Sequence, residues 1–266
     1  MPKDLTKELD IATREFYVNS LKILNNSDIP YLLGGAYALA EYADVHRHTR
    51  DLDLFVKEED CQRVLDLLGH NGYRTELTFS HWLGKAFFAD EYIDVIFSSG
   101  NAVARVDNDW FKYSAEATVF GVPVRLCPAE EVIWSKSYVM ERERFDGADI
   151  AHIIRSRASV MDWDRLLKRF GDHWRLLLSH LLLFTFVYPD EKDSIPASVM
   201  SQLFNRAQNE LSRPAEATNT CQGPLISREQ YLVDVDLWHY SDPRLMPQGN
   251  MSKQQIAQWT AAIASK

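Results

Sequence analysis

Residues 31–56 contain a glycine pair, a basic cluster and two acids within an otherwise apolar stretch. The segment reads YLLGGAYALAEYADVHRHTRDLDLFV. Its acids, Asp51 and Asp53, alternate with Leu52 and Leu54. Strand residues two positions apart point to the same face of a sheet. We therefore expect both carboxylates on one face of a strand whose leucines face the core.

A third acid, Asp94, lies in a similar apolar context, YIDVIF. Carboxylates on apolar strands are costly to bury, and a divalent cation is the usual compensation. We therefore predict that Asp51, Asp53 and Asp94 are catalytic residues and ligands of Mg²⁺, with two ions bound. An isolated Asp-x-Asp is more often an ordinary strand-end or solvent-facing pair. The upstream glycines and the third acid favour the metal site here.

The glycine pair and the basic cluster are candidates for nucleotide binding. Gly34 and Gly35 lack side chains, so backbone N–H groups at the start of the next helix can approach phosphates. The alternative is a tight strand-to-helix turn. We expect Arg47 and Thr49 to brace the loop or contact phosphates, whereas the alternative is a solvated loop. The sequence leaves the role of the neighbouring His48 and Arg50 open.

Composition narrows the classes of partner. The chain has 266 residues, 46% of them hydrophobic, and a net charge of −9. This charge argues against a broad nucleic-acid footprint, although a local basic patch remains open. The three cysteines are far apart and fit reduced cytosolic thiols. The N-terminus has no apolar signal region, and the apolar run at 176–188 is too short for a membrane span. We expect a cytoplasmic protein without membrane contact.

Apolar spacing and turn residues divide the chain into a mixed first half and a helical second half. The expected strands are residues 31–33, 52–56, 73–79, 85–89, 92–97, 117–120, 122–126 and 231–235; the expected helices are residues 5–24, 36–42, 61–68, 129–140, 149–157, 163–170 and 174–188. The sequence thus predicts an α+β fold, a mixed sheet with flanking helices followed by a helical region.

Four segments follow from this pattern. Residues 1–127 form the mixed domain, and residues 128–188 form a helical region packed on it. Residues 189–230 are linker-like, because residues 212–223 are rich in small and turn-forming residues. Residues 231–266 form a C-terminal extension of unknown role.

Charged residues in the helical half have two interpretations. Lys136 can reach a β- or γ-phosphate as a point charge, or it can lie on a solvated helix face. Arg142 and Arg144 could pair with Asp146 and Asp149 and hold the helices together, but for both arginines we favour a solvated charged helix face with i,i+4 pairs.

The succession of GG, RHTRDLDLFV and IDVIF resembles the nucleotidyltransferase superfamily related to DNA polymerase beta. Within it, the R-x-T-x-D-[IL]-D-L form resembles the group of AbiEii-type toxins and of MNT-like and aminoglycoside nucleotidyltransferases. The resemblance covers residues 30–97 strongly and residues 128–155 more weakly. It implies that residues 1–127 are the nucleotidyltransferase domain.

The resemblance also implies roles for single residues. It implies two Mg²⁺ ions on Asp51 and Asp53, and a third acid, Asp94, that acts as general base or as a ligand. It further implies triphosphate contacts from Gly34 and Gly35, and matches Lys136 to the lysine of the helical domain.

The activity expected from this pattern is Mg²⁺-dependent transfer of a nucleoside monophosphate from an NTP such as ATP to an acceptor hydroxyl, with release of pyrophosphate. The acceptor remains open between RNA (a tRNA end in a toxin-like protein), a small molecule such as an aminoglycoside, and a protein. An antitoxin or another protein partner is a further expectation. The non-enzymatic alternatives are a degenerate nucleotide sensor or partner module, and an α/β interaction domain whose motif is accidental.

Overall fold

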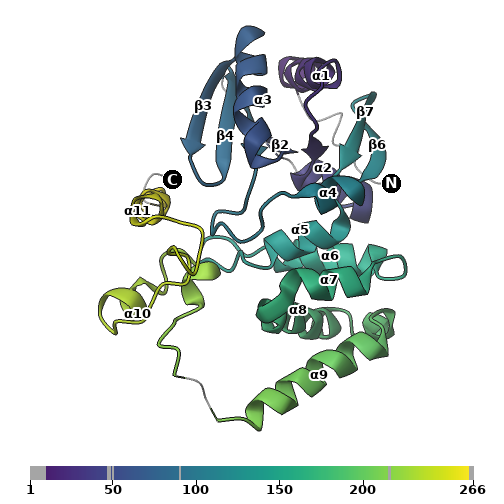
Figure 1. The fold of residues 1–266 in the computed structure, drawn as a ribbon. Coiled ribbons are helices and arrows are strands. Elements are labelled where there is room, and N and C mark those ends of the chain that lie inside the picture. Colours follow the sequence, from purple (N-terminus) through teal and green to yellow (C-terminus); the bar gives the residue numbers. More distant parts are fainter. Residues whose placement is uncertain (1–9, 47–48, 50, 90, 215–216, 264–266) are drawn as a thin grey trace. The chain divides into compact units, whose positions relative to one another are not determined.

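The computed structural model describes residues 10–46, 49, 51–89, 91–214 and 217–263. These residues form two compact units, the first from the described parts of Met1–Pro128 and Gly249–Lys266 and the second from Ala129–Gln248. No helix in the described ranges combines the length and the apolarity that a membrane span requires. Figure 1 shows the elements of both units.

The first unit is built on a seven-stranded sheet with the order β3-β4-β5-β2-β1-β7-β6. Its strands are β1 (Leu32–Leu33), β2 (Asp51–Phe55), β3 (Arg74–Phe79), β4 (Leu83–Phe88), β5 (Glu91–Ile96), β6 (Ala115–Val119) and β7 (Val122–Leu126). Its helices are α1 (Ile11–Asn25), α2 (Gly35–Ala43), α3 (Glu58–His70), α4 (Asn108–Lys112) and α11 (Lys253–Ala261). The pairs β2–β5 and β1–β7 are parallel, and the other neighbouring strands are antiparallel. The predicted α+β mixed sheet with flanking helices is confirmed.

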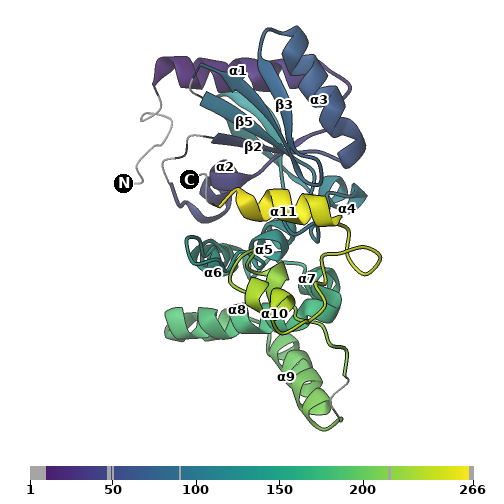
Figure 2. The same cartoon turned by 90° about the vertical axis from the view of Figure 1, so that its left-hand side faces the viewer.

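One face of this sheet carries the core of the unit. Leu52 and Leu54 of β2 are fully buried there, in one cluster with Ile93 and Val95 of β5. In Figure 2, α1 and α3 cover this face. Burial of each such side chain contributes roughly 1.5–3 kcal/mol. The alternation of leucine with aspartate in β2 therefore determines which face of the strand packs into the core and which face carries the carboxylates.

Helix α3 shows why the sequence folds this way locally. Its buried residues Cys61, Val64, Leu65 and Leu68 recur at the spacing of one helical face. The acids in its first turn lie at the positive end of the helix dipole, where negative charge is favourable. The helix ends at His70, two residues beyond the predicted end at Leu68.

The C-terminal helix α11 belongs to the first unit. Its Trp259 ring makes edge contacts with Phe79 and Trp82, with ring centroids 5.1 and 5.0 Å apart. Gln258 Nε2 donates to the carbonyl of Thr78 at 3.2 Å. Figures 1 and 2 place α11 and α2 on the face of the sheet opposite α1 and α3. The C-terminal segment 249–263 therefore packs against the sheet, although it is far from the other elements of this unit in the sequence.

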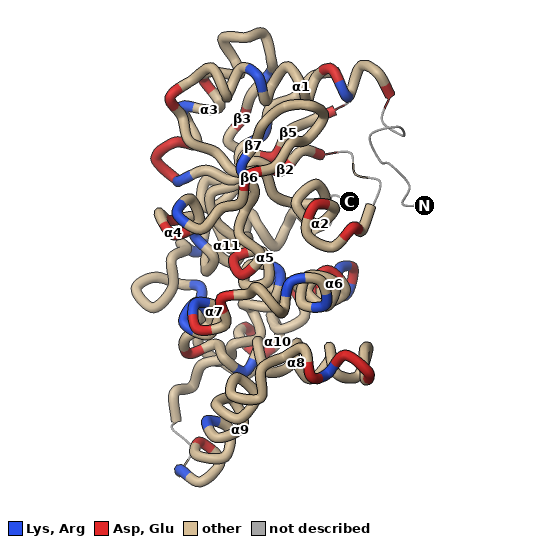
Figure 3. The backbone as a smooth tube through the Cα atoms, turned by 90° about the vertical axis from the view of Figure 1, so that its right-hand side faces the viewer, with Lys and Arg blue, Asp and Glu red and all other residues tan. Residues whose placement is uncertain are grey.

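The second unit is helical. Its helices are α5 (Ala129–Lys136), α6 (Gly147–Arg157), α7 (Trp163–Phe170), α8 (Trp174–Val187), α9 (Ala197–Leu211) and α10 (Leu232–Asp236), with short 3₁₀ turns at Gly171–His173, Pro189–Ser194 and Gly223–Leu225. Figure 3 shows charged residues of both signs along α6 and α7. The segment predicted to be linker-like thus contains the 15-residue helix α9.

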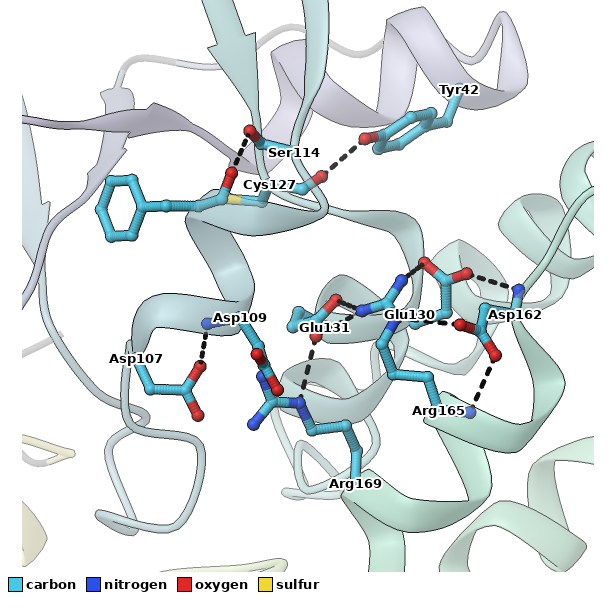
Figure 4. Close-up of polar contacts among 11 residues, drawn as sticks. Tyr42, Asp107, Asp109, Ser114, Cys127, Glu130, Glu131, Asp162, Arg165 and Arg169 are labelled. Atoms are coloured by element: carbon cyan, nitrogen blue, oxygen red, sulfur yellow. Dashed lines mark hydrogen bonds and ion pairs between the residues drawn. The ribbon is translucent and has the colours of Figure 1, made fainter.

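A buried charge cluster joins α5 to α7. Arg165 Nη2 lies 2.5 Å from Glu130 Oε2, and its Nη1 bonds to Glu131, which is fully buried. Arg169 Nε adds a contact of 3.1 Å to Glu131 Oε1. Burial raises the pKa of Glu131, and the two guanidinium groups act in the opposite direction. Figure 4 shows how these side chains converge.

Two predicted elements are wrong. Residues 231–235 were expected as a strand, but Leu232–Asp236 is helical. The helix expected over residues 129–140 ends at Lys136. Its expected last residue, Met140, instead donates its backbone N–H to the carbonyl of Ile226 at 3.0 Å. The spacing of apolar residues along a short segment cannot predict a hydrogen bond to a residue so distant in the sequence.

The contacts of Trp259 predict a measurable role for α11 in stability. Trp259→Ala should lower the free energy of unfolding by about 2 kcal/mol, less than for a fully buried Trp because its ring is half-buried. The matched control is Trp238→Ala, since Trp238 is 62% exposed; we expect a change within about 0.5 kcal/mol there. Urea unfolding followed by circular dichroism measures both. Equal losses in the two variants would contradict the assignment of α11 to this unit.

Candidate active site

The three predicted acids converge on the sheet face opposite the main core. Asp51 and Asp53 alternate with the buried leucines of β2, as predicted. Asp94 lies directly beside Asp53, because the two residues are register partners in the parallel pair of β2 and β5. One oxygen from each carboxylate lies within 4.8 Å of the others. The strand pairing thus produces the cluster that the motif spacing predicted.

The glycine pair leads directly into this cluster. The N–H of Gly34 donates to the carbonyl of Asp53 at 2.9 Å, which fixes the turn against β2. Gly34 caps α2 without a side-chain hydrogen bond. Gly35 has φ +55°, and a Cβ at this position would lie 1.7 Å from Asp53 Oδ2. Only glycine fits here without displacing the acid, because both the backbone conformation and the space require it.

The basic cluster before β2 is only partly described. Thr49 Oγ1 donates to Asp51 Oδ1, so this hydroxyl orients one acid of the cluster. Arg47, His48 and Arg50 lie outside the described residues. The predicted contact of Arg47 with the loop or with phosphate therefore stays a prediction.

The strand register also brings Lys85 of β4 to the acids. Lys85 is the register partner of Asp94, and its Nζ lies 2.5 Å from Asp94 Oδ1. Lys85 begins the predicted strand 85–89 but was not among the predicted site residues. The motif does not reveal this residue, because its position depends on how β4 pairs with β5.

The electrostatics of the cluster follow from burial and like charge. Burial raises the pKa of Asp94; Lys85 acts in the opposite direction, and Asp51 raises it further. Burial and then Asp51 raise the pKa of Tyr37 on α2 and of Tyr92 on β5. The negative charge of the cluster thus disfavours ionisation of both neighbouring tyrosines.

The cluster fits a divalent cation. Mg²⁺ prefers carboxylate oxygens at about 2.0–2.1 Å in octahedral geometry and usually keeps waters and substrate phosphates as further ligands. Three carboxylates whose oxygens already lie within 4.8 Å of one another supply such a donor set. Gly35 keeps the space beside Asp53 clear of a side chain. Asp51, Asp53 and Asp94 are therefore the residues that can hold the ion.

Lys136 lies in the second unit and is engaged by two acids of that unit. Its Nζ lies 2.7 Å from Asp146 Oδ2 and 2.9 Å from Asp149 Oδ2. Arg144 completes this group with two bonds of 2.8 Å to Asp146, the alternative to the solvated helix face that the sequence favoured. Burial acts to raise the pKa of Asp146, but Arg144 and Lys136 hold it below its ordinary value. The phosphate contact of Lys136 stays a prediction.

A comparison with protein families supports the chemistry inferred from this geometry. Residues 18–124 match the family described as aminoglycoside-2''-adenylyltransferase. The matched segment is less than half of the chain and contains both glycines and all three acids. The predicted class of enzyme, a nucleotidyltransferase, is confirmed. The resemblance is supported at the level of the superfamily, and the subgroup with AbiEii-type toxins stays a prediction.

Several solved structures are similar to this chain at low sequence identity. The antibiotic-resistance factor ANT(2'')-Ia is 20% identical, with 65% of this chain and 98% of that chain covered and a TM-score of 0.46. The lincosamide antibiotic adenylyltransferase LnuA, lincomycin-bound, is 18% identical, with 53% and 94% covered and a TM-score of 0.38. An antigenic nucleotidyltransferase-like protein from Paracoccidioides brasiliensis is 14% identical, with 68% and 91% covered and a TM-score of 0.41. No curated protein sequence gives a significant match.

The close approach of Gly35 to Asp53 can be tested by metal binding. Gly35→Ala should weaken Mn²⁺ binding by roughly 10–100-fold, the range for groups that orient metal ligands, because the new Cβ must displace the carboxylate. The matched control is Gly121→Ala: Gly121 also has positive φ (+80°), but nothing lies within 4 Å of its Cβ position. Both variants carry backbone strain of about 1–2 kcal/mol, so only the metal site should distinguish them. Equal Mn²⁺ affinity in electron paramagnetic resonance titrations would contradict this account.

The ion pairs of Lys136 predict a large effect on stability. Lys136→Met should lower the free energy of unfolding by about 3 kcal/mol at neutral pH, because it removes a cation from two buried acids. The deficit should shrink towards about pH 4, since an unpaired buried carboxylate acquires a raised pKa and takes up a proton. Denaturant titrations at several pH values measure this, with Lys168→Met on the exposed face of α7 as the control. Unchanged stability together with a loss of nucleotide affinity would instead support the predicted phosphate contact.

Proposed function

We propose that this protein transfers a nucleoside monophosphate from an NTP to a hydroxyl group of a small, cationic acceptor. The observation that carries the proposal is the row of acids across β2 and β5 beside the glycine turn. Asp53 and Asp94 are register partners, and Gly35 has room only for hydrogen next to Asp53. A glycine turn at a helix N-terminus suits a triphosphate, and the acids suit the Mg²⁺ that accompanies it.

The proposed reaction is an in-line displacement. The acceptor oxygen forms a bond to the α-phosphorus, the bond from that phosphorus to the bridging oxygen breaks, and pyrophosphate leaves. Bound Mg²⁺ would neutralise phosphate charge and lower the pKa of the acceptor hydroxyl. Asp94 is our candidate for the group that takes the hydroxyl proton, since its carboxylate lies directly beside Asp53 on the same face of the sheet.

The other acids have positioning roles in this proposal. Asp51 and Asp53 would hold the ion or ions on the same face of β2, and Thr49 orients Asp51 through its hydroxyl. Gly34 and Gly35 would admit the triphosphate to the start of α2. Two Mg²⁺ ions, as in the related superfamily, remain part of the proposal.

The preference for a small cationic acceptor rests on two observations. The family that matches residues 18–124 is described by its action on aminoglycosides, which are cationic. The net charge of −9 favours a cationic acceptor over a polyanion such as RNA. A toxin-like activity on RNA, a protein acceptor and a nucleotide-sensor role remain outcomes that the experiment below separates.

Asp53→Asn should reduce nucleotidyl transfer at least about 100-fold, the scale for losing one group that stabilises a transition state. The matched control is Asp66→Asn, because Asp66 lies on the exposed side of α3, where its carboxylate accepts from Gln62 at 2.7 Å. We would measure pyrophosphate release and label transfer with Mg²⁺ and each labelled NTP. The acceptors would be an aminoglycoside such as tobramycin, total RNA and a protein extract.

Each outcome has a definite meaning. Label on the aminoglycoside that is lost in Asp53→Asn but kept in Asp66→Asn supports the proposal. Label on RNA or protein that is likewise lost in Asp53→Asn and kept in Asp66→Asn would support the nucleotidyltransferase activity but show a different acceptor. Saturable NTP binding without pyrophosphate release would support the sensor, and full activity in Asp53→Asn would overturn the proposed site.

A further inference from the structure

A lysine lies within the acid cluster and has no role in the proposed reaction. Lys85 Nζ is 2.5 Å from Asp94 Oδ1 and 3.8 Å from the centroid of the Tyr92 ring. The side chains of Lys85 and Asp94 are only 19% and 13% exposed. The contact is therefore largely shielded from solvent, where an ion pair is stronger than on an open surface.

Strand pairing fixes this lysine on the same face as the acids. Lys85 is the register partner of Asp94, which is in turn the register partner of Asp53. The three side chains form a row across β4, β5 and β2. The ammonium thus lies at one end of a site that we assign to divalent ions.

Charge balance gives this arrangement a consequence. Among the described residues of the cluster, three carboxylates carry three negative charges, and the ammonium of Lys85 leaves two. One divalent ion neutralises that remainder. A second divalent ion would face an uncompensated positive charge unless a triphosphate supplied further anionic oxygens. The ammonium also bonds to the Oδ1 atom of Asp94, so that oxygen is already committed.

We propose that Lys85 is a positioning residue that occupies Oδ1 of Asp94 and limits the nucleotide-free site to one divalent ion. The site then accepts a second ion only together with the triphosphate, which prevents two ions from occupying it unproductively. This inference rests on the proposed function, because it takes the three acids as metal ligands. It goes beyond that function by assigning the order of binding: one divalent ion first, and the second together with the triphosphate.

The test is a Mn²⁺ titration of the full chain without nucleotide, followed by electron paramagnetic resonance of the free ion. Wild type should bind one Mn²⁺ tightly. Lys85→Met should bind a second ion or bind the first at least about tenfold more tightly, because a nearby positive charge is removed. Lys85→Arg keeps the charge and should resemble wild type.

The matched control is Lys57→Met in the same unit, whose ammonium lies 3.8 Å from Glu59 Oε1 on a more exposed pair. Its Mn²⁺ binding should equal that of wild type. A purely structural role of Lys85 predicts lower thermal stability in Lys85→Met without any change in Mn²⁺ affinity or stoichiometry. Thermal unfolding of every variant separates the two roles.

Further outcomes overturn the inference or the function on which it rests. Unchanged Mn²⁺ binding in folded Lys85→Met, beside normal binding by wild type, overturns the role of Lys85 alone. If Lys85→Met does not fold, Lys85→Gln supplies the neutral side chain, and a tenfold change in Lys85→Arg also overturns the role. No Mn²⁺ binding by wild type or any variant overturns the proposed metal site as well.

Discussion

The parallel pairing of β2 with β5 is the constraint on which the site depends. It places Asp53 beside Asp94, while Leu52 and Leu54 of β2 pack into the core on the other face. A shift by one residue would turn both acids of β2 into the core and both leucines out of it. The apolar burial that stabilises the sheet therefore also selects the register that assembles the carboxylates. Stability and site geometry arise from the same alternation.

The acid cluster works against the stability of the isolated fold. Burial and the neighbouring Asp51 raise the pKa of Asp94, so its ionised form is disfavoured in the folded chain. Lys85 offsets part of this cost from β4. A bound cation would offset the rest, and ligand binding would then stabilise the folded state by mass action. Perturbed carboxylates held by a rigid sheet are typical of sites that bind charge.

Local patterns in the sequence predicted the elements of the site, and long-range pairing supplied the rest. The i, i+2 spacing of Asp51 and Asp53 was sufficient to predict their common face, and the apolar context of Asp94 predicted that it also lies in a strand. The contact of Lys85 with Asp94 depends on the register of two antiparallel strands, which no local spacing encodes. The same holds for Trp259, whose ring partners lie about 180 residues earlier in the chain. Unlike Asp94, neither Lys85 nor Trp259 belongs to a motif, so distant pairing alone places them and neither contact was predicted.

In the second unit, Lys136 has the charge that phosphate binding requires, but its ammonium already pairs with two acids. Lys136 bonds to both Asp146 and Asp149, whose side chains are 8% and 9% exposed. Transfer of its ammonium to a phosphate would leave Asp149 without this cation and Asp146 with Arg144 alone. Removal of one partner from a buried ion pair costs about 3–5 kcal/mol. A single charge-assisted hydrogen bond to phosphate contributes roughly 1.5–3 kcal/mol. The balance favours the ion pairs, so Lys136 would contact phosphate only if it kept both acids as partners.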